Sequence, residues 1–331
     1  FFFFFFFFFF GRKKRNRYNK TNNKNKMINI VCCIDDNFTS YCGVLMTSIC
    51  ENKGDENIHF HILIDTIKVS NEKTLKGIVE KYSQFITFHK VDHQKLENCP
   101  IRKGDHVSIA AYFRILIPMI IPNSVDKVLY LDCDMVVLSD LDDLWNTDIK
   151  DKAVGVVPDM FSQDVRVYNR LDYEMHLGYF NSGVLLMNLD YWRANNLSIR
   201  ILDYIDENPD KLIYWDQDAL NYVLREKKMN MPFRYNVQEG FYWRDPFIAK
   251  KYWEEMFKAA ENPVILHYTG IIKPWYKECK HPKGNLYLKY LYLSPWHNSK
   301  MKHVKFKLRI KFFVINLLIR MGFMSNRSLY R

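Results

Sequence analysis

Two carboxylates, Asp132 and Asp134, interrupt an apolar stretch of the chain. Residues 128–131 (VLYL) precede them and residues 135–138 (MVVL) follow, and both runs are typical of buried strands. Burying unpaired carboxylates costs several kcal/mol, so the pair needs a compensating partner. Side chains at i and i+2 of a strand share a face, so Cys133 should point away into the core. At a strand end, such a pair predicts a clamp for a divalent cation that carries a phosphate.

Two later segments place polar side chains next to apolar runs. Residues 179–192 (YFNSGVLLMNLDYW) put Asn181 and Ser182 ahead of an expected buried strand. Residues 214–224 (YWDQDALNYVL) put Asp216 and Gln217 at the start of an expected helix. Acids at that position often only cap the helix, so spacing alone leaves their role open.

Three more candidates are His267, Lys273 and Arg114. His267 ends an expected strand at 264–267 and is followed by Gly270 and Lys273, which suggests a metal ligand and a phosphate contact. Taken alone, such a histidine is more often structural. Arg114 is the single charge in residues 108–118 (SIAAYFRILIP), an expected helix that ends at a proline. Its guanidinium either snorkels to the surface or reaches a phosphate or carboxylate, and the sequence favours neither.

The elements that must position these residues alternate along the first third of the body. Strands are expected at 28–34, 58–65 and 85–91, and helices at 41–52 and 71–82. This order predicts a doubly wound α/β fold with a mostly parallel central sheet flanked by helices. His59 and His61 are expected at an edge or on the surface of the second strand.

A short helix is expected after the carboxylate pair. In residues 139–145 (SDLDDLW), Ser139 and Asp142 fit a capping box. Asp140, Asp142 and Asp143 would then stabilise the start of that helix rather than belong to the site.

The net charge of +11 is confined to the two ends of the chain. Residues 1–26 carry eight Lys or Arg and residues 297–331 carry nine, with no acid in either segment, which leaves a net −6 for residues 27–296. The body therefore lacks the basic face that specific nucleic-acid binding requires. The seven cysteines form no Cys-x-x-Cys pair, so neither a disulfide framework nor a zinc knuckle is indicated, and a cytoplasmic location is expected.

The two ends differ in character. Residues 1–26, with ten Phe followed by basic residues, are expected to be a non-native or disordered extension, with Met27 as the natural start. Residues 281–331 form a basic, aromatic tail, and its apolar run FFVINLLI is too short to cross a membrane. We expect this tail to lie peripherally on an anionic membrane surface; packing on the body or RNA binding are the alternatives.

Together, these motifs resemble glycosyltransferase family 8, which includes lipopolysaccharide galactosyl- and glucosyltransferases and glycogenin. The resemblance covers residues 27–276 and is carried by six segments in order: IDDNF, SIAAYFRILIP, KVLYLDCDMVV, YFNSGVLLMNLDYW, WDQDALN and HYTGIIKPW. It implies a GT-A type, Rossmann-like catalytic domain at 27–280. It also implies retaining transfer of a hexose, glucose or galactose, from a UDP-sugar with Mn²⁺, or Mg²⁺ in its place.

The resemblance assigns roles residue by residue. Asp132, Asp134 and His267 match the metal ligands, and Gln217 and Asp216 match the catalytic positions. The donor would contact Cys33, Asp35, Asn37, Arg114, Asp132, Cys133, Asp134, Asp159, Asn181, Ser182, Asp216, Gln217, His267, Gly270 and Lys273. Ser182 stands where the family often has Ala.

Gln is a poor nucleophile, so retention by same-face attack is favoured over a double displacement. The acceptor, a saccharide, glycolipid or glycoprotein, is not specified by any motif, because residues 161–179 match no family segment. Glycogenin-like self-glucosylation remains within the class. Outside the class there are two alternatives, a nucleotidyltransferase and an inactive UDP-sugar-binding scaffold. A nucleotidyltransferase would need a Gly-rich basic loop after the first strand, and the acidic loop DDNFTS there disfavours it.

Overall fold

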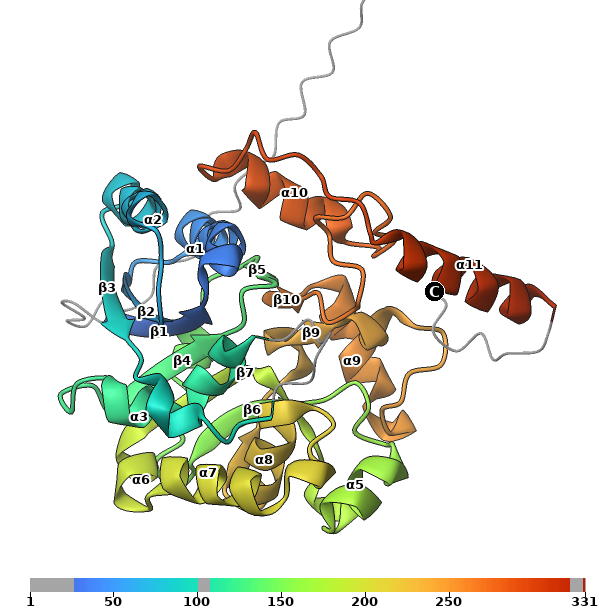
Figure 1. Ribbon diagram of the computed structural model, residues 1–331, viewed down its shortest axis with the longest axis horizontal. Coiled ribbons are helices and arrows are strands. Elements are labelled where there is room, and N and C mark those ends of the chain that lie inside the picture. The colour runs from blue at the N-terminus through green and yellow to red at the C-terminus, as the bar shows by residue number, and fades with distance from the viewer. Residues whose placement is uncertain (1–26, 101–107, 322–329, 331) are drawn as a thin grey trace, which may run out of the picture.

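The structure is a computed structural model that describes residues 27–100, 108–321 and 330. Its centre is a seven-stranded sheet with the order β3-β2-β1-β4-β7-β6-β8 (Figure 1). The strands are β1 (Met27–Ile34), β2 (Asn57–Ile64), β3 (Phe85–Lys90), β4 (Lys127–Leu131), β6 (Val154–Pro158), β7 (Phe180–Asn188) and β8 (Lys228–Asn230). β7 runs antiparallel to both neighbours, and the other four pairings are parallel, as the α/β prediction requires.

A second, three-stranded sheet lies beside the first and contains the predicted metal ligand His267. It has the order β5-β10-β9, with β5 (Met135–Val137), β9 (Val237–Gln238) and β10 (Ile265–His267). β5 follows β4 after only three residues, so the chain passes from one sheet to the other through the bend that holds Asp132 and Asp134.

Helices cover both faces of the large sheet (Figure 1). α1 (Thr39–Asn52) and α2 (Val69–Lys81) lie on one face; α6 (Leu189–Ala194), α7 (Leu197–Glu207) and α8 (Trp215–Leu224) lie on the other. The alternation of β1 divides its side chains between two cores, with Ile30 packing in the α1 core and Val31 in the α7–α8 core. The expected strands and helices of the first 91 residues are confirmed within two residues at each end.

The remaining helices lie in the second half of the chain and after β3. The α-helices among them are α3 (Ile117–Ile120), α4 (Asp142–Trp145), α5 (Val165–Leu171), α9 (Trp253–Glu261), α10 (Gly284–Leu293) and α11 (Phe306–Arg320), and the longest 3₁₀ segment of the described residues is η3 (Ile109–Leu116). α10 packs on α1, where the amide of Asn52 donates to the Tyr290 hydroxyl at 2.7 Å, so part of the C-terminal tail joins the core.

Several local predictions were wrong. Pro118 does not end a helix but lies in the first turn of α3, where its missing N–H leaves no helical bond unmade. The predicted capping box is absent, because α4 begins at Asp142 and Ser139 is too far upstream to cap it. His61 is buried, since β2 is an interior strand, and it hydrogen bonds to His89 at 3.0 Å and Asn29 at 3.2 Å. Asn181 and Ser182 lie inside β7 rather than ahead of it.

Residues 1–26, predicted to be a non-native or disordered extension, lie outside the described residues. Within the described part of the chain, no helix combines the length and the apolar character needed to span a membrane.

Candidate functional site

The side chains of Asp132, Asp134 and His267 converge where the two sheets meet. One ligand atom from each lies within 4.8 Å of the other two. His267 Nε2 lies 3.1 Å from Asp134 Oδ1 and 3.9 Å from Asp132 Oδ2. The register of β10 against β5 causes this approach, because His267 pairs with Met135, the residue next to Asp134.

The prediction that both acids interrupt a strand was imprecise. β4 ends at Leu131 and β5 begins at Met135, so both acids lie in the bend between two strands. They still face one way, and Cys133 faces the other, into the core, as expected. Both carboxylates keep partial access to solvent, with 26% and 17% of the side chains exposed, so a cation can reach them.

The imidazole of His267 is oriented by Asn236, a fully buried residue that sequence reasoning missed. His267 Nδ1 lies 3.0 Å from Asn236 Oδ1, and the Asn236 amide donates to Asn181 Oδ1 at 2.9 Å. Since an amide oxygen only accepts, Nδ1 carries a hydrogen, and Nε2 faces the two acids, where it can bind a metal in the neutral form of the ring. This is the arrangement that metal-binding histidines use, so the three side chains fit a divalent metal such as Mn²⁺.

Lys273 adds a positive charge next to the ligand cluster. Its ammonium group contacts Asp134 Oδ2 at 2.7 Å and donates to the Tyr268 carbonyl at 2.6 Å. Burial alone would raise the pKa of Asp134, but the charges of Lys273 and His267 and their hydrogen bonds hold it well below its ordinary value. Asp134 is therefore ionised and ready to bind a cation at neutral pH.

Arg114 joins the cluster to a second group of polar side chains. Its buried guanidinium pairs with Asp132 at 3.0 Å and with Asp216 at 3.0 Å, and it donates to the Ser182 carbonyl at 2.7 Å. Arg114 thus reaches carboxylates rather than snorkelling. Burial raises the pKa of Asp216 to about 6, while the charge of Arg114 opposes this rise.

Gln217, on the first turn of α8, lies at the centre of the second group. Its Oε1 accepts from the backbone N–H of Ser182 at 3.0 Å, and its Nε2 donates to Asp159 Oδ2 at 3.3 Å. Asn181 also donates to Asp159, at 3.0 Å. Burial raises the pKa of Asp159, against the hydrogen bonds that it accepts.

A buried ion pair is connected to Gln217 by hydrogen bonds, and sequence reasoning missed this pair as well. Asp218 is fully buried, pairs with Arg170 on α5 at 2.6 Å and accepts from the Tyr179 hydroxyl at 2.8 Å. That hydroxyl in turn accepts from Gln217 Nε2 at 3.1 Å. The preceding Trp215 has φ +48°, a costly conformation for a bulky residue, which turns the chain into α8 at the site.

Ten of the predicted residues form one connected chain of contacts, linked through Asn236. They are Lys273, Asp134, His267, Asn181, Asp159, Gln217, Ser182, Arg114, Asp132 and Asp216.

The other five predicted residues are not part of this chain of contacts. Asp35 and Asn37 follow the end of β1, where the Asp35 carboxylate accepts from the Asn37 backbone N–H at 2.8 Å. The thiol of Cys33 lies near Arg114, Asp132 and Asp216, whose charges act on it. Gly270 lies against the Glu239 carboxylate so closely that a Cβ there would overlap it. The side chain of Cys133 faces the core, which leaves only its backbone for a donor.

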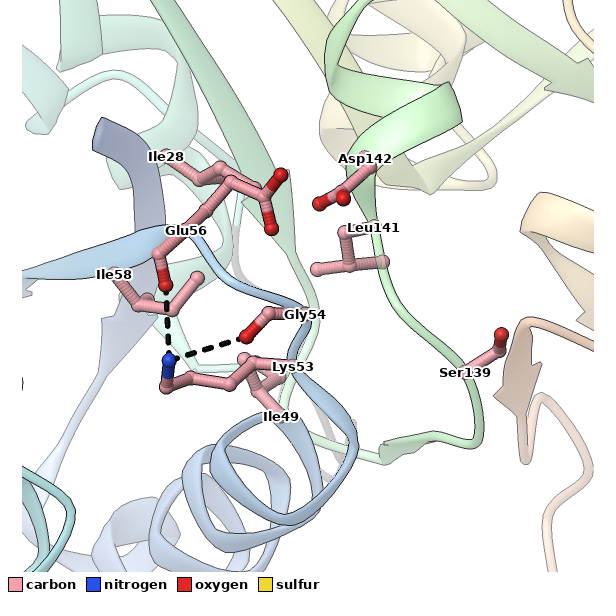
Figure 2. A pocket seen from close by; sticks show the side chains of 9 residues that line it. All are labelled: Ile28, Ile49, Lys53, Gly54, Glu56, Ile58, Ser139, Leu141 and Asp142. Carbon is pink, nitrogen blue, oxygen red and sulfur yellow. Dashed lines mark hydrogen bonds between the residues drawn. The ribbon is translucent and has the colours of Figure 1, made fainter. Parts of the chain in front are cut away.

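A separate hollow lies between α1, β2 and the start of α4 and contains no predicted donor or metal residue. Figure 2 shows the Glu56 and Asp142 side chains pointing toward each other across it, beside Lys53 and Gly54. Asp142 lies in the first turn of α4, so it belongs to the helix start as expected.

Comparison with known proteins gives a family and a fold. The family model described as "Glycosyl transferase family 8" matches residues 29–279. "General stress protein A" of Bacillus subtilis is 32% identical over 286 residues, covering 83% of this chain and 96% of that protein. A "Lipopolysaccharide 1,2-glucosyltransferase" of Escherichia coli K12 is 27% identical over 305 residues, covering 92% of this chain and 89% of that protein.

Among solved structures, the galactosyltransferase LgtC in complex with donor and acceptor sugar analogs superposes with a TM-score of 0.72 at 27% identity. The match covers 86% of this chain and all of LgtC. An active-site mutant of LgtC superposes with a TM-score of 0.74 at 26% identity, covering 81% of this chain and 96% of the mutant. The fold is therefore of the GT-A type, and the chain is a member of glycosyl transferase family 8.

Proposed function

We propose that this protein transfers a hexose, glucose or galactose, from a UDP-sugar to a saccharide, glycolipid or glycoprotein, with retention of anomeric configuration and with Mn²⁺. One observation carries the proposal. The cation-binding cluster of Asp132, Asp134 and His267 is joined through Arg114 to Asp216, beside Gln217. A site that holds a diphosphate at one end and a sugar at the other needs this pairing of a metal clamp with hydrogen-bonding groups.

The diphosphate end follows from charge. Mn²⁺, or the harder cation Mg²⁺ in its place, would be held by Asp132, Asp134 and His267. A metal there would stabilise the negative charge of the departing UDP. Lys273 already lies beside Asp134 and supplies a second positive charge for the leaving diphosphate. Asp35 and Asn37, which follow the end of β1, would contact the nucleoside.

The sugar end is built from neutral and ionised hydrogen-bonding groups. Asp159, Asn181 and Gln217 contact one another around one spot, and the buried Asp159 carboxylate accepts from both amides. Such groups can exchange their mutual hydrogen bonds for those of the sugar hydroxyls.

Retention by same-face attack fits the surroundings of both candidate catalytic residues. Asp216 is paired with Arg114, which weakens it as a nucleophile, and Gln217 is an amide. The acceptor hydroxyl would then attack from the face that UDP leaves, while the sugar has oxocarbenium character. Mass-spectrometric detection of a glycosyl adduct on Asp216 during turnover would overturn this mechanism.

The relatives support a hexose donor without fixing which one. Two of them are named a lipopolysaccharide 1,2-glucosyltransferase and a lipopolysaccharide 1,3-galactosyltransferase. Membership in the family favours glycosyl transfer over nucleotidyl transfer. An inactive sugar-binding scaffold is opposed by the presence of every predicted metal ligand and of Gln217.

A donor screen tests the proposal. The protein is incubated with UDP-glucose, UDP-galactose and related donors, with and without Mn²⁺, and UDP release is measured. We expect metal-dependent release with one hexose donor, abolished by Asp134→Ala and unchanged by Asp190→Asn, an exposed acid on α6. Absence of metal-dependent release with every UDP-sugar would refute the enzyme assignment.

We also propose that α11 binds an anionic membrane surface. Its exposed apolar residues recur at helical spacing on one face: Phe306, Ile310, Phe313, Val314, Leu317 and Met321. Exposed Lys305, Lys307 and Lys311 add positive charge along the same helix. A basic helix with an apolar face suits the interface of an acidic bilayer.

Vesicle sedimentation tests this surface. The full chain should sediment with phosphatidylglycerol vesicles and much less with phosphatidylcholine vesicles. Phe313→Glu combined with Leu317→Glu should abolish sedimentation, whereas Tyr292→Glu, an exposed aromatic on α10, should not. Equal sedimentation of the double variant and the wild type would contradict the assignment.

A further inference from the structure

Three cysteines converge directly behind the carboxylate pair. Cys32 comes from β1, Cys42 from α1 and Cys133 from the bend between β4 and β5. Their sulfur atoms all lie within 4.8 Å of one another, and none forms a disulfide. Residues this distant in sequence meet because β1, the helix α1 that covers the sheet and the bend after β4 lie together.

The three thiols are buried and lie next to one another. Cys32 and Cys42 are fully buried, and Cys133 is 6% exposed. The interaction with Cys133 and burial raise the pKa of Cys32 well above its ordinary value. At Cys42 the interaction with Cys133 lowers the pKa, but Cys32 and burial outweigh it, so the pKa of Cys42 is also raised. Cys133 lies between Asp132 and Asp134 in the chain and is the most exposed of the three thiols.

The spacing suits a thiolate-bound metal. Zinc–sulfur bonds of about 2.3 Å place three sulfurs roughly 4 Å apart around a single ion, in trigonal or tetrahedral geometry. The observed separations lie within 4.8 Å, so closing on an ion needs side-chain rather than backbone movement. Sulfur ligands also select a different class of cation from the oxygen-rich cluster of Asp132 and Asp134.

We propose that Cys32, Cys42 and Cys133 form a second metal site that binds one thiophilic divalent cation of the zinc and cadmium class. On binding, the three thiols release three protons to solvent and form three metal–sulfur bonds, leaving a net charge of −1. A monovalent copper ion would leave −2 in the same apolar surroundings, which burial penalises more strongly. Since Cys133 lies between Asp132 and Asp134, the two sites share one short segment of backbone.

The competing interpretation is that the thiols only fill space, as buried cysteines often do. The two interpretations differ in what cadmium does. A packing cluster would not bind Cd²⁺ through sulfur, whereas a metal site would give a thiolate-to-cadmium charge-transfer band in the ultraviolet.

The experiment titrates the full chain with Cd²⁺ in excess Mg²⁺, which competes for the oxygen ligands. We expect the band to saturate at one Cd²⁺ per chain. Cys42→Ser should abolish it, and Cys50→Ser should leave it unchanged, because Cys50 is a buried cysteine of the same helix outside the cluster. Circular dichroism and thermal melting check that both variants fold.

Cadmium NMR of the wild type provides a readout that does not depend on any variant. A resonance in the range of sulfur-rich sites supports the proposal. The absence of a charge-transfer band, a band that persists in Cys42→Ser, or a resonance only in the range of oxygen and nitrogen ligands would overturn it. None of these readouts uses glycosyl transfer, so they stand apart from the outcome of the donor screen.

Discussion

Replacing Asn236 by alanine tests whether a second layer of residues prepares the metal ligands. Asn236 is fully buried, accepts from His267 Nδ1 at 3.0 Å and donates to Asn181 at 2.9 Å. The substitution removes the group that keeps the hydrogen on Nδ1 and the lone pair on Nε2. His267 can then adopt the other tautomer, in which Nε2 carries the hydrogen and cannot bind a metal.

The expected magnitude follows from these contacts. Losing the partner of a metal-binding histidine lowers metal affinity by about 10- to 100-fold, which corresponds to roughly 1.4–2.7 kcal/mol. Asn181 Oδ1 loses the hydrogen bond from Asn236 in this variant, but it still accepts from the Gly183 backbone N–H at 3.1 Å and so keeps a partner. The loss should therefore appear in metal affinity more than in the free energy of unfolding.

The assay is a Mn²⁺ titration followed by the electron paramagnetic resonance of the free ion, together with denaturant unfolding of the metal-free protein. Asp134→Ala is the reference that should abolish binding. Unchanged Mn²⁺ affinity in Asn236→Ala, with tight binding by the wild type, would refute the orienting role. Failure of the wild type to bind Mn²⁺ would instead refute the metal site itself.

Three further changes probe other parts of the site. Tyr179→Phe removes the hydroxyl that accepts from Gln217, and steady-state donor hydrolysis should show kcat reduced about tenfold with a smaller change in KM. Gly183→Ala places a methyl group 2.4 Å from His267 Cε1, so Mn²⁺ affinity should fall. Calorimetry should show that the free energy of unfolding falls by about 1–3 kcal/mol. The pKa of Asp216 is raised from 3.8 to about 6 in the folded state, which binds the proton more tightly. The free energy of unfolding of the wild type, relative to Asp216→Asn, should therefore fall by roughly 3 kcal/mol as the pH rises from about 3 to 7, with no further change at higher pH, in unfolding measured at each pH.

The fold was predictable because its signals are local. Apolar runs at β1 and β2, each followed by a helical pattern, are enough to predict parallel strands with crossover helices. The errors came where a position depends on its neighbours in space. His61 has the polarity of a surface residue, yet β3 and β1 flank its strand and bury it. Pro118 has the residue type of a helix end, yet a 3₁₀ segment precedes it and the new helix starts there.

The residues of the candidate site also fall into those that local motifs predict and those that depend on neighbours in space. Residues in short motifs, such as Asp132, Asp134 and Gln217, stand out by their place beside apolar runs. Asn236 and Arg170 do not, because one follows a single-turn 3₁₀ segment, η6 (Phe233–Tyr235), and the other lies on a short helix that matches no motif. Their importance arises only when the chain brings Asn236 to His267, 31 residues away, and Arg170 to Asp218, 48 residues away. No pattern in the sequence encodes those separations.

The segment Asp132-Cys133-Asp134 shows how one local feature can serve two purposes that a sequence pattern cannot separate. The same bend that turns both carboxylates toward His267 turns Cys133 toward Cys32 and Cys42. A strand would have given the same alternation, so the sequence predicts the directions correctly from the wrong element. Backbone hydrogen bonds hold both ends of the bend: the Asp132 N–H donates to the Gly183 carbonyl at 2.9 Å, and the Asp134 carbonyl accepts from the Tyr268 N–H at 3.0 Å, with Cys133 between them. Any movement that a metal imposes on the thiols would therefore pass directly to the carboxylates, and Mn²⁺ affinity measured with and without Cd²⁺ would report it.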